Sequence, residues 1–272
     1  MPWSSDVAER LKRRHRAEAV PWIEKRTIVI YALAEGGLPV PQGSGVLLQV
    51  ADRGFVVTAA HCLDGWGKVR FLCAVDDGGF IDLTTVQAHV TRDRGDADFA
   101  LLPLDDEMFA RVSSSRAFVR LSEVDAHGDA PATGIHALFG YPVQLASRRE
   151  GCIVSDALYY PTMLKNVSDL DRDLSVAFFM DDEHVDEVGD RTRLPALQGV
   201  SGGGMWRLHT KGDDPEAWSV DRIRLVGIEH TVVERSGTIK GVRARHVLAG
   251  MAAQFPELAP SVRLVGVFVA AT

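Results

Sequence analysis

The sequence predicts an all-β fold with its strands in two groups. From Thr27 onward the chain consists of short β-branched and aromatic runs separated by Gly, Asp and Pro. Explicit turn sequences, ADRG at 51–54 and DDGG at 76–79, lie between the runs. No helical pattern intervenes between successive runs, so antiparallel barrels or sandwiches are favoured over an α/β sheet.

The predicted strands fall before about residue 105 and after about residue 130. The first group is TIVIYAL, GVLLQV, GFVVTAA, KVRFLCAV, DLTTVQAHV and FALLPL. The second group is GIHALFGY, CIVSDALYY, LSVAFFM, GMWRL and RIRLVGIEHTVV. We therefore expect two β-subdomains, residues 27–125 and residues 126–272.

Helices are predicted at both ends of the chain. Ser4, Ser5 and Asp6 are candidate N-caps for a surface helix that ends near Pro21, within an extension of residues 1–26. This segment is locally basic, and a solvated helix face is favoured over a docking arm. The run RHVLAGMAAQF before Pro256 predicts a C-terminal helix.

Composition argues against several classes of function. The chain has 272 residues, 46% of them apolar, and a formal net charge of −7, which gives no electrostatic reason to expect a nucleic-acid or anionic-membrane partner. Neither an export signal nor a membrane-spanning stretch is evident. The three cysteines, Cys62, Cys73 and Cys152, fit neither a zinc site nor a dense disulfide framework, so we expect the cytoplasm as the compartment.

Three segments carry residues suited to nucleophilic catalysis. They read Thr-Ala-Ala-His-Cys at 58–62, Asp-Ala-Asp-Phe-Ala-Leu-Leu at 96–102 and Gly-Val-Ser-Gly-Gly-Gly at 199–204. A serine hydroxyl needs a neutral imidazole to remove its proton, and the imidazole needs a carboxylate to hold its tautomer and stabilise its charge. Converging backbone N–H groups, which glycines favour, can then bind an oxyanion.

In chain order these segments resemble the trypsin-like (chymotrypsin-fold) serine proteases, bacterial-type members included. The resemblance implies two six-stranded antiparallel β-barrels and a serine endopeptidase with no cofactor and no metal. It assigns His61 as base and acid, Asp98 as its carboxylate and Ser201 as nucleophile. The N–H groups of Gly199 and Ser201 would form the oxyanion hole. Asp96 and, after it, Asp93 remain open as alternatives for the carboxylate.

The same resemblance implies where substrate binds. It places Pro195 at the base of the primary specificity pocket, and His230, Thr231 and Val232 on the strand beside the substrate. With no carboxylate near Pro195, we expect a preference for an uncharged side chain. Cleavage after Arg or Lys would instead direct attention to Glu229 or the 181–190 loop as the missing acid.

Two departures from the family pattern affect activation and redox state. Val200 stands where many members have an Asp that pairs with a newly cut N-terminus, so we expect apolar packing to hold the loop and no need for cleavage near Arg26. Cys62 has no cysteine in the preceding strand and is expected to be a buried free thiol rather than bridged to Cys73.

Two other readings remain. The acidic segment 181–190, DDEHVDEVGD, matches no EF-hand spacing and is expected to be a solvated loop. The alternative function is a catalytically silent interaction or sensing module with a protease fold. The expected partners are a protein or peptide substrate and a regulatory protein, with no nucleic acid and no membrane.

Overall fold

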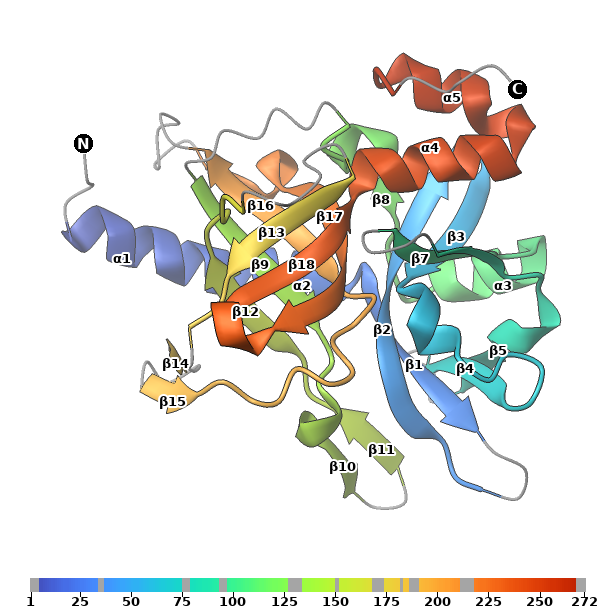
Figure 1. Ribbon diagram of the computed structural model, residues 1–272, viewed down its shortest axis with the longest axis horizontal. Coiled ribbons are helices and arrows are strands. Elements are labelled where there is room, and N and C mark those ends of the chain that lie inside the picture. The colour runs from blue at the N-terminus through green and yellow to red at the C-terminus, as the bar shows by residue number, and fades with distance from the viewer. Residues whose placement is uncertain are drawn as a thin grey trace.

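Two sheets that lie side by side make up most of the protein (Figure 1), and the predicted all-β, two-barrel trypsin-like class is confirmed. In the computed structural model, the described residues are 5–33, 37–74, 79–92, 97–126, 134–149, 152–167, 174–181, 183–185, 191–210 and 218–267.

The first sheet has eight strands. They are β1 (Thr27–Leu33), β2 (Val40–Val50), β3 (Arg53–Thr58), β4 (Arg70–Ala74), β5 (Phe80–Asp82), β6 (His89–Arg92), β7 (Asp98–Pro103) and β8 (Val119–Arg120). The order is β5-β4-β1-β2-β3-β7-β6, with every pair antiparallel. The short strand β8 joins β2 in parallel, so this sheet differs from the six-stranded antiparallel arrangement that the resemblance implies.

The second sheet has six strands, all antiparallel, in the order β12-β9-β16-β17-β18-β13. They are β9 (Gly134–Gly140), β12 (Leu158–Thr162), β13 (Ser175–Phe179), β16 (Gly204–Thr210), β17 (Arg224–Val233) and β18 (Thr238–Arg243). Two separate hairpins join it, β10 (Ala146–Arg149) with β11 (Cys152–Ser155) and β14 (Glu183–Val185) with β15 (Arg191–Arg193).

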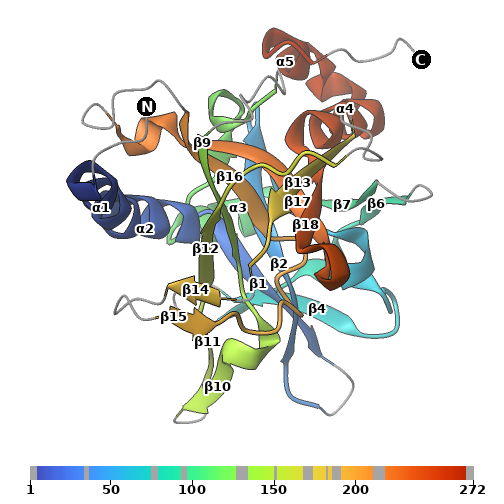
Figure 2. The same cartoon turned by 60° about the vertical axis from the view of Figure 1, so that its left-hand side comes forward.

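The predicted N-terminal helix continues beyond Pro21. It comprises α1 (Ser5–Arg14), a π-helical turn (His15–Ala19) and α2 (Val20–Glu24). Pro21 lies in the first turn of α2, directly after the π-helical turn, where the backbone hydrogen-bond pattern changes. Ser5 is already helical, so it is not the N-cap, and Ser4 lies outside the described residues. Figure 2 shows α1 and α2 following one another along the second sheet.

The extension is docked rather than free. Ile23 is fully buried and Trp22 meets Trp206 of β16 edge to face at 5.8 Å between ring centroids. The Arg14 guanidinium donates a hydrogen bond to the Trp218 carbonyl at 2.7 Å, which ties the basic face of this segment to the second half of the chain. The solvated-face interpretation is therefore wrong for Arg14.

Three more α-helices occur among the described residues. The helix α3 (Asp106–Ser113) lies in a stretch that looks irregular in sequence, and the Asp105 side chain caps it by accepting from the Met108 N–H at 2.8 Å. The predicted C-terminal helix is α4 (Ala244–Gln254), and α5 (Ala259–Leu264) follows. No described helix has the length and apolar character needed to cross a bilayer.

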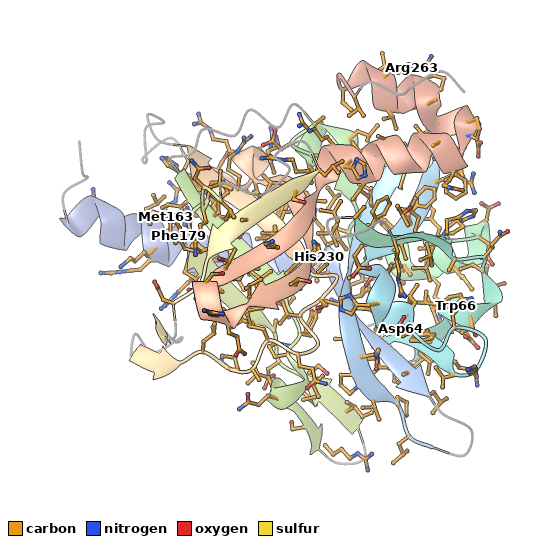
Figure 3. All side chains as sticks on the ribbon, in the orientation of Figure 1. Asp64, Trp66, Met163, Phe179, His230 and Arg263 are labelled. Atoms are coloured by element: carbon orange, nitrogen blue, oxygen red, sulfur yellow. The ribbon has the colours of Figure 1, made fainter. Side chains whose placement is uncertain are left out.

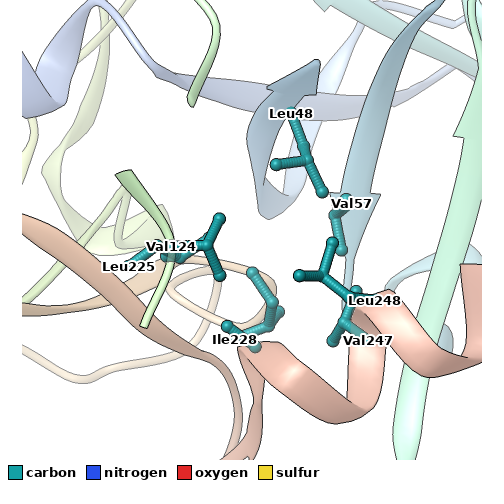
Figure 4. A pocket seen from close by; sticks show the side chains of 8 residues that line it. Leu48, Val57, Val124, Leu225, Ile228, Val247 and Leu248 are labelled. Atoms are coloured by element: carbon teal, nitrogen blue, oxygen red, sulfur yellow. The ribbon is translucent and has the colours of Figure 1, made fainter. Parts of the chain in front are cut away.

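Helix α4 seals the junction between the two sheets. It lies over one end of both (Figures 1 and 2), and Val247 and Leu248 point into an apolar cavity of about 10 Å³ (Figure 4). The other lining residues come from β2, β3, β17 and the segment after β8. Space of this size without polar groups does not hold a stable water, so the junction is a dry apolar contact.

Candidate active site

The predicted base and carboxylate meet at one end of the paired strands β3 and β7. His61 lies in a 3₁₀ turn (Ala60–Leu63) directly after β3, and Asp98 is the first residue of β7, which pairs with β3. The His61 Nδ1 is 2.5 Å from one carboxylate oxygen of Asp98. The His61 backbone N–H donates to the other oxygen at 3.1 Å. Asp93 and Asp96 lie outside the described residues.

Each member of this pair changes the acidity of the other. The hydrogen bond with Asp98 raises the pKa of His61 above its ordinary value. Burial opposes the ionised form of Asp98, but hydrogen bonds from His61 hold the pKa of Asp98 below its ordinary value. The pair can therefore stabilise an imidazolium that forms when His61 takes up a proton.

Ser201 lies in the loop before β16 and is held against the first sheet. Its carbonyl accepts from the Ser44 N–H at 2.8 Å and from the Cys62 thiol at 3.2 Å, which places it beside the turn that carries His61. Among the described residues no hydrogen bond joins the Ser201 hydroxyl to the His61 ring. Such bonds often form only once a substrate is bound.

The two predicted oxyanion-hole amides are unengaged. In the part of the chain that the structure describes, neither the Gly199 nor the Ser201 N–H donates a hydrogen bond. The carbonyl that precedes Gly199 accepts from Val143, and the carbonyl that precedes Ser201 accepts from Gly203, each at 2.8 Å. Because the N–H and C=O of a trans peptide point in opposite directions, both N–H groups point away from these partners and are available to a ligand.

The residues that depart from the family pattern are buried. Val200 is fully buried in the apolar core of the second half, in agreement with the expected packing. Cys62 and Cys73 are both buried free thiols, so no bridge joins them. Gly43 is the residue of β2 that faces Cys62, because a Cβ at Gly43 would stand 2.6 Å from the Cys62 sulfur. Glycine carries no thiol, so this part of β2 has no disulfide partner for Cys62.

The predicted substrate residues lie on two segments near the nucleophile loop. Pro195 is half-buried in the chain leading from β15 to this loop. His230, on β17, lies near the middle of the molecule (Figure 3), and its Nδ1 is 3.0 Å from the Thr231 hydroxyl. Thr231 is exposed, and Val232 is half-buried.

Glu229, which the sequence analysis considered only as an acid for a substrate Arg or Lys, lies within the site. It is 1% exposed, and burial raises its pKa to about 8. The His61 charge and the Ser201 hydroxyl act to lower the pKa of this carboxyl, which places it beside both of these residues. An acidic residue inside the apolar run GIEHTVV is the signal that could have marked it.

No group of three or more His, Cys, Asp or Glu side chains suited to a metal ion occurs among the described residues. In the acidic segment 181–190, expected to be a loop, Glu183–Val185 instead form strand β14, and most of the remaining positions lie outside the described residues.

Comparison with known proteins supports the fold. No protein-family model matches this chain, and no curated protein matches its sequence. Among solved structures, a double variant of human heparin binding protein (CAP37) superposes with a TM-score of 0.52 at 14% identity, covering 85% of this chain and 92% of that one. The two proteins share the trypsin-like fold.

A second similar structure comes from a study of the coupled folding and binding of the intrinsically disordered VPg protein of Sesbania mosaic virus. It has a TM-score of 0.46 at 12% identity and covers 80% of this chain and 87% of that one.

Proposed function

We propose that the protein is a serine endopeptidase of the bacterial trypsin-like type. The observation that carries the proposal is the doubly hydrogen-bonded pair of His61 and Asp98 beside Ser201. The unengaged N–H groups of Gly199 and Ser201 add to it. In this proposal residues 27–125 supply the base and carboxylate, and residues 126–272 supply the nucleophile and the oxyanion hole.

The reaction would proceed through an acyl-enzyme. The Ser201 hydroxyl attacks the peptide carbonyl while His61 Nε2 takes its proton, and the Gly199 and Ser201 N–H groups bind the resulting oxyanion. His61 then gives the proton to the departing amine. In the second half, His61 activates a water that hydrolyses the ester and returns Ser201 to its free form. Asp98 holds the His61 tautomer throughout.

The substrate in this proposal is a protein or peptide whose backbone lies along the end of β17, at His230, Thr231 and Val232, with Pro195 lining the pocket for the adjacent side chain. A regulatory protein partner is part of the proposal, because a broad protease would damage the cell that makes it. The cytoplasm is the proposed location, and the two unpaired thiols, Cys62 and Cys73, support it.

A fluorophosphonate probe tests this proposal against the silent-module alternative, since it modifies only an activated serine. We expect labelling at Ser201 in the folded protein, and loss of labelling in Ser201→Ala and in His61→Ala. Peptide mapping by mass spectrometry identifies the modified residue, and circular dichroism confirms that each variant is folded. A folded wild-type protein that takes up no label contradicts the proposal and favours an interaction module.

A further inference from the structure

Ser44, on β2 of the first sheet, connects that sheet to the nucleophile loop. It is completely buried. Its N–H donates to the Ser201 carbonyl at 2.8 Å, and its carbonyl accepts from the Thr58 hydroxyl at 2.7 Å. Its own hydroxyl donates to the Gly199 carbonyl and accepts from the Tyr141 N–H, both at 2.8 Å. The hydroxyl therefore joins the nucleophile loop to the segment after β9.

The nucleophile loop contains a turn that has a second accessible conformation. The Val200 N–H donates to the Leu197 carbonyl at 2.9 Å, and Gly199, the third residue of the turn, has a φ of 92°. This is the pattern of a type II turn. Rotation of the central peptide, between Gln198 and Gly199, gives a type I turn, which glycine also tolerates. That rotation would point the Gly199 N–H away from the reacting carbonyl.

Two contacts oppose the rotation. The Gln198 carbonyl accepts from the Val143 N–H at 2.8 Å, and the Ser44 hydroxyl holds the Gly199 carbonyl at the other end of the same residue. The Ser44 hydroxyl also accepts from the Tyr141 N–H, two residues before Val143. It therefore restrains Gly199, on one side of the peptide that must not rotate, and the segment whose Val143 N–H binds the carbonyl of that peptide. Val200 cannot supply the ion pair that orders this loop in many members of the family that the sequence resembles.

We propose that Ser44 is a positioning residue, whose hydroxyl holds the nucleophile loop in the turn that directs the Gly199 N–H at the oxyanion. The inference rests on the proposed function, because it concerns the oxyanion of that reaction. Ser44 touches no substrate atom in this scheme and acts through Gly199. Replacing the hydroxyl by hydrogen leaves the buried Gly199 carbonyl and Tyr141 N–H without their partner, which removes the restraint on the turn.

The first test compares peptide hydrolysis by Ser44→Ala and Ser44→Thr. We expect Ser44→Ala to lower kcat about 100-fold, the effect of losing one oxyanion donor, with little change in KM. Ser44→Thr keeps the hydroxyl and is expected to retain most of kcat. Thr27→Val is the matched control, because it removes another fully buried hydroxyl. Thr27 is the first residue of β1, and its hydroxyl donates to the Ile23 carbonyl at 3.1 Å. It should keep kcat.

A pair of ligands separates positioning from a general loss of structure. A peptide boronic acid forms a tetrahedral adduct with Ser201 and needs the oxyanion hole, whereas the product peptide does not. In Ser44→Ala the boronate affinity should fall about as much as kcat, and the product affinity should not. A folded Ser44→Ala protein with wild-type kcat and wild-type boronate affinity overturns the inference.

Amide hydrogen exchange tests the same contact without catalysis. The Tyr141 N–H should be protected in the wild type and exchange at least about tenfold faster in Ser44→Ala, since it loses its buried acceptor. If Tyr141 exchange is unchanged in Ser44→Ala, the inference is overturned, even if the wild type hydrolyses no peptide. If exchange changes as expected but the wild type hydrolyses no peptide, only the proposed function is contradicted. Should Ser44→Ala not fold, Ser44→Cys, with its weaker donor, replaces it, and wild-type kcat and exchange in Ser44→Cys would then count against the inference.

Discussion

Asp98 uses both carboxylate oxygens on His61, one on the ring at 2.5 Å and one on the backbone N–H at 3.1 Å. The backbone bond fixes the carboxylate in the plane where the ring bond needs it. The carboxylate is therefore placed by the same residue that it orients, with the Arg92 guanidinium 3.9 Å from one of its oxygens.

Asp98→Asn should lower kcat about 10⁴-fold, because an amide favours the wrong imidazole tautomer and cannot stabilise its charge. Activity in the wild type should rise with pH through the raised pKa of His61, since the base must be neutral, and this rise should move to lower pH in Asp98→Asn. Kinetics across a pH series measure both effects. Asp96→Asn is the control, and an equally large loss in that variant with its fold intact would show that the carboxylate assignment is wrong.

The uncut chain should be active. The Arg26 guanidinium lies 3.6 Å from the centre of the Trp22 ring, and the Arg26 backbone carbonyl accepts from the Leu47 N–H at 2.8 Å. Thr27, which would become the new N-terminus, is completely buried. We expect full-length protein, verified as intact by mass spectrometry, to react with a fluorophosphonate at least as fast as protein cut after Arg26. Reaction of the cut form alone, abolished by acetylating its new terminus, would show an insertion mechanism.

Glu229→Gln should stabilise the protein at alkaline pH. In the folded protein its pKa is raised to about 8, so the unfolded chain ionises first as pH rises. Neutral Glu229 therefore leaves the free energy of unfolding at its full value below the ordinary pKa of a glutamate. As pH rises from there toward 8, the free energy of unfolding falls by about 1.4 kcal/mol per pH unit. Urea unfolding should give similar free energies for both proteins at pH 4.5 and a more stable variant at pH 8. Glu107→Gln, on the exposed face of α3, is the control, and a pH-independent difference for Glu229→Gln would refute this account.

Leu248→Ala should cost about 2 to 5 kcal/mol of unfolding free energy, because Leu248 is 1% exposed and lines the cavity between α4 and both sheets. Leu264→Ala is the matched control, since Leu264 is 87% exposed and its loss should change stability by less than about 0.5 kcal/mol. Urea unfolding monitored by tryptophan fluorescence measures both. Equal effects would mean that α4 does not hold the two halves together.

Most strands were predictable because their apolar runs are long and their turns explicit, as with TIVIYAL in β1 and the ADRG turn before β3. The predicted strand DLTTVQAHV is wrong in its middle, where Leu83–Thr85 form a 3₁₀ turn, and its last two residues lie in β6. Helix α3 was not, since only the Asp105 cap marks it in a stretch of mixed composition. The parallel pairing of β8 with β2 joins segments about seventy residues apart and has no local signal.

Local motifs single out His61, Asp98, Gly199 and Ser201 in the sequence, and the structure brings the His61 ring and the Asp98 carboxylate together. Ser44 has no such motif, and although the acidic residue within GIEHTVV marks Glu229, the sequence does not show what packs against either side chain. Their roles come from contacts between the two halves of the chain, which only the folded structure supplies.

The docking of β2 against the nucleophile loop has a consequence for biosynthesis. A chain emerging from the ribosome folds from its N-terminus, so the half that holds His61 and Asp98 is complete before Ser201 and its supporting strands β17 and β18 have been made. Until then the Ser44 N–H and the Cys62 thiol lack the Ser201 carbonyl, to which both donate in the folded protein. Under the proposed function, nascent chains would carry a base without a nucleophile, and proteolytic competence would arise only once synthesis has passed α4 and the two halves can pack together.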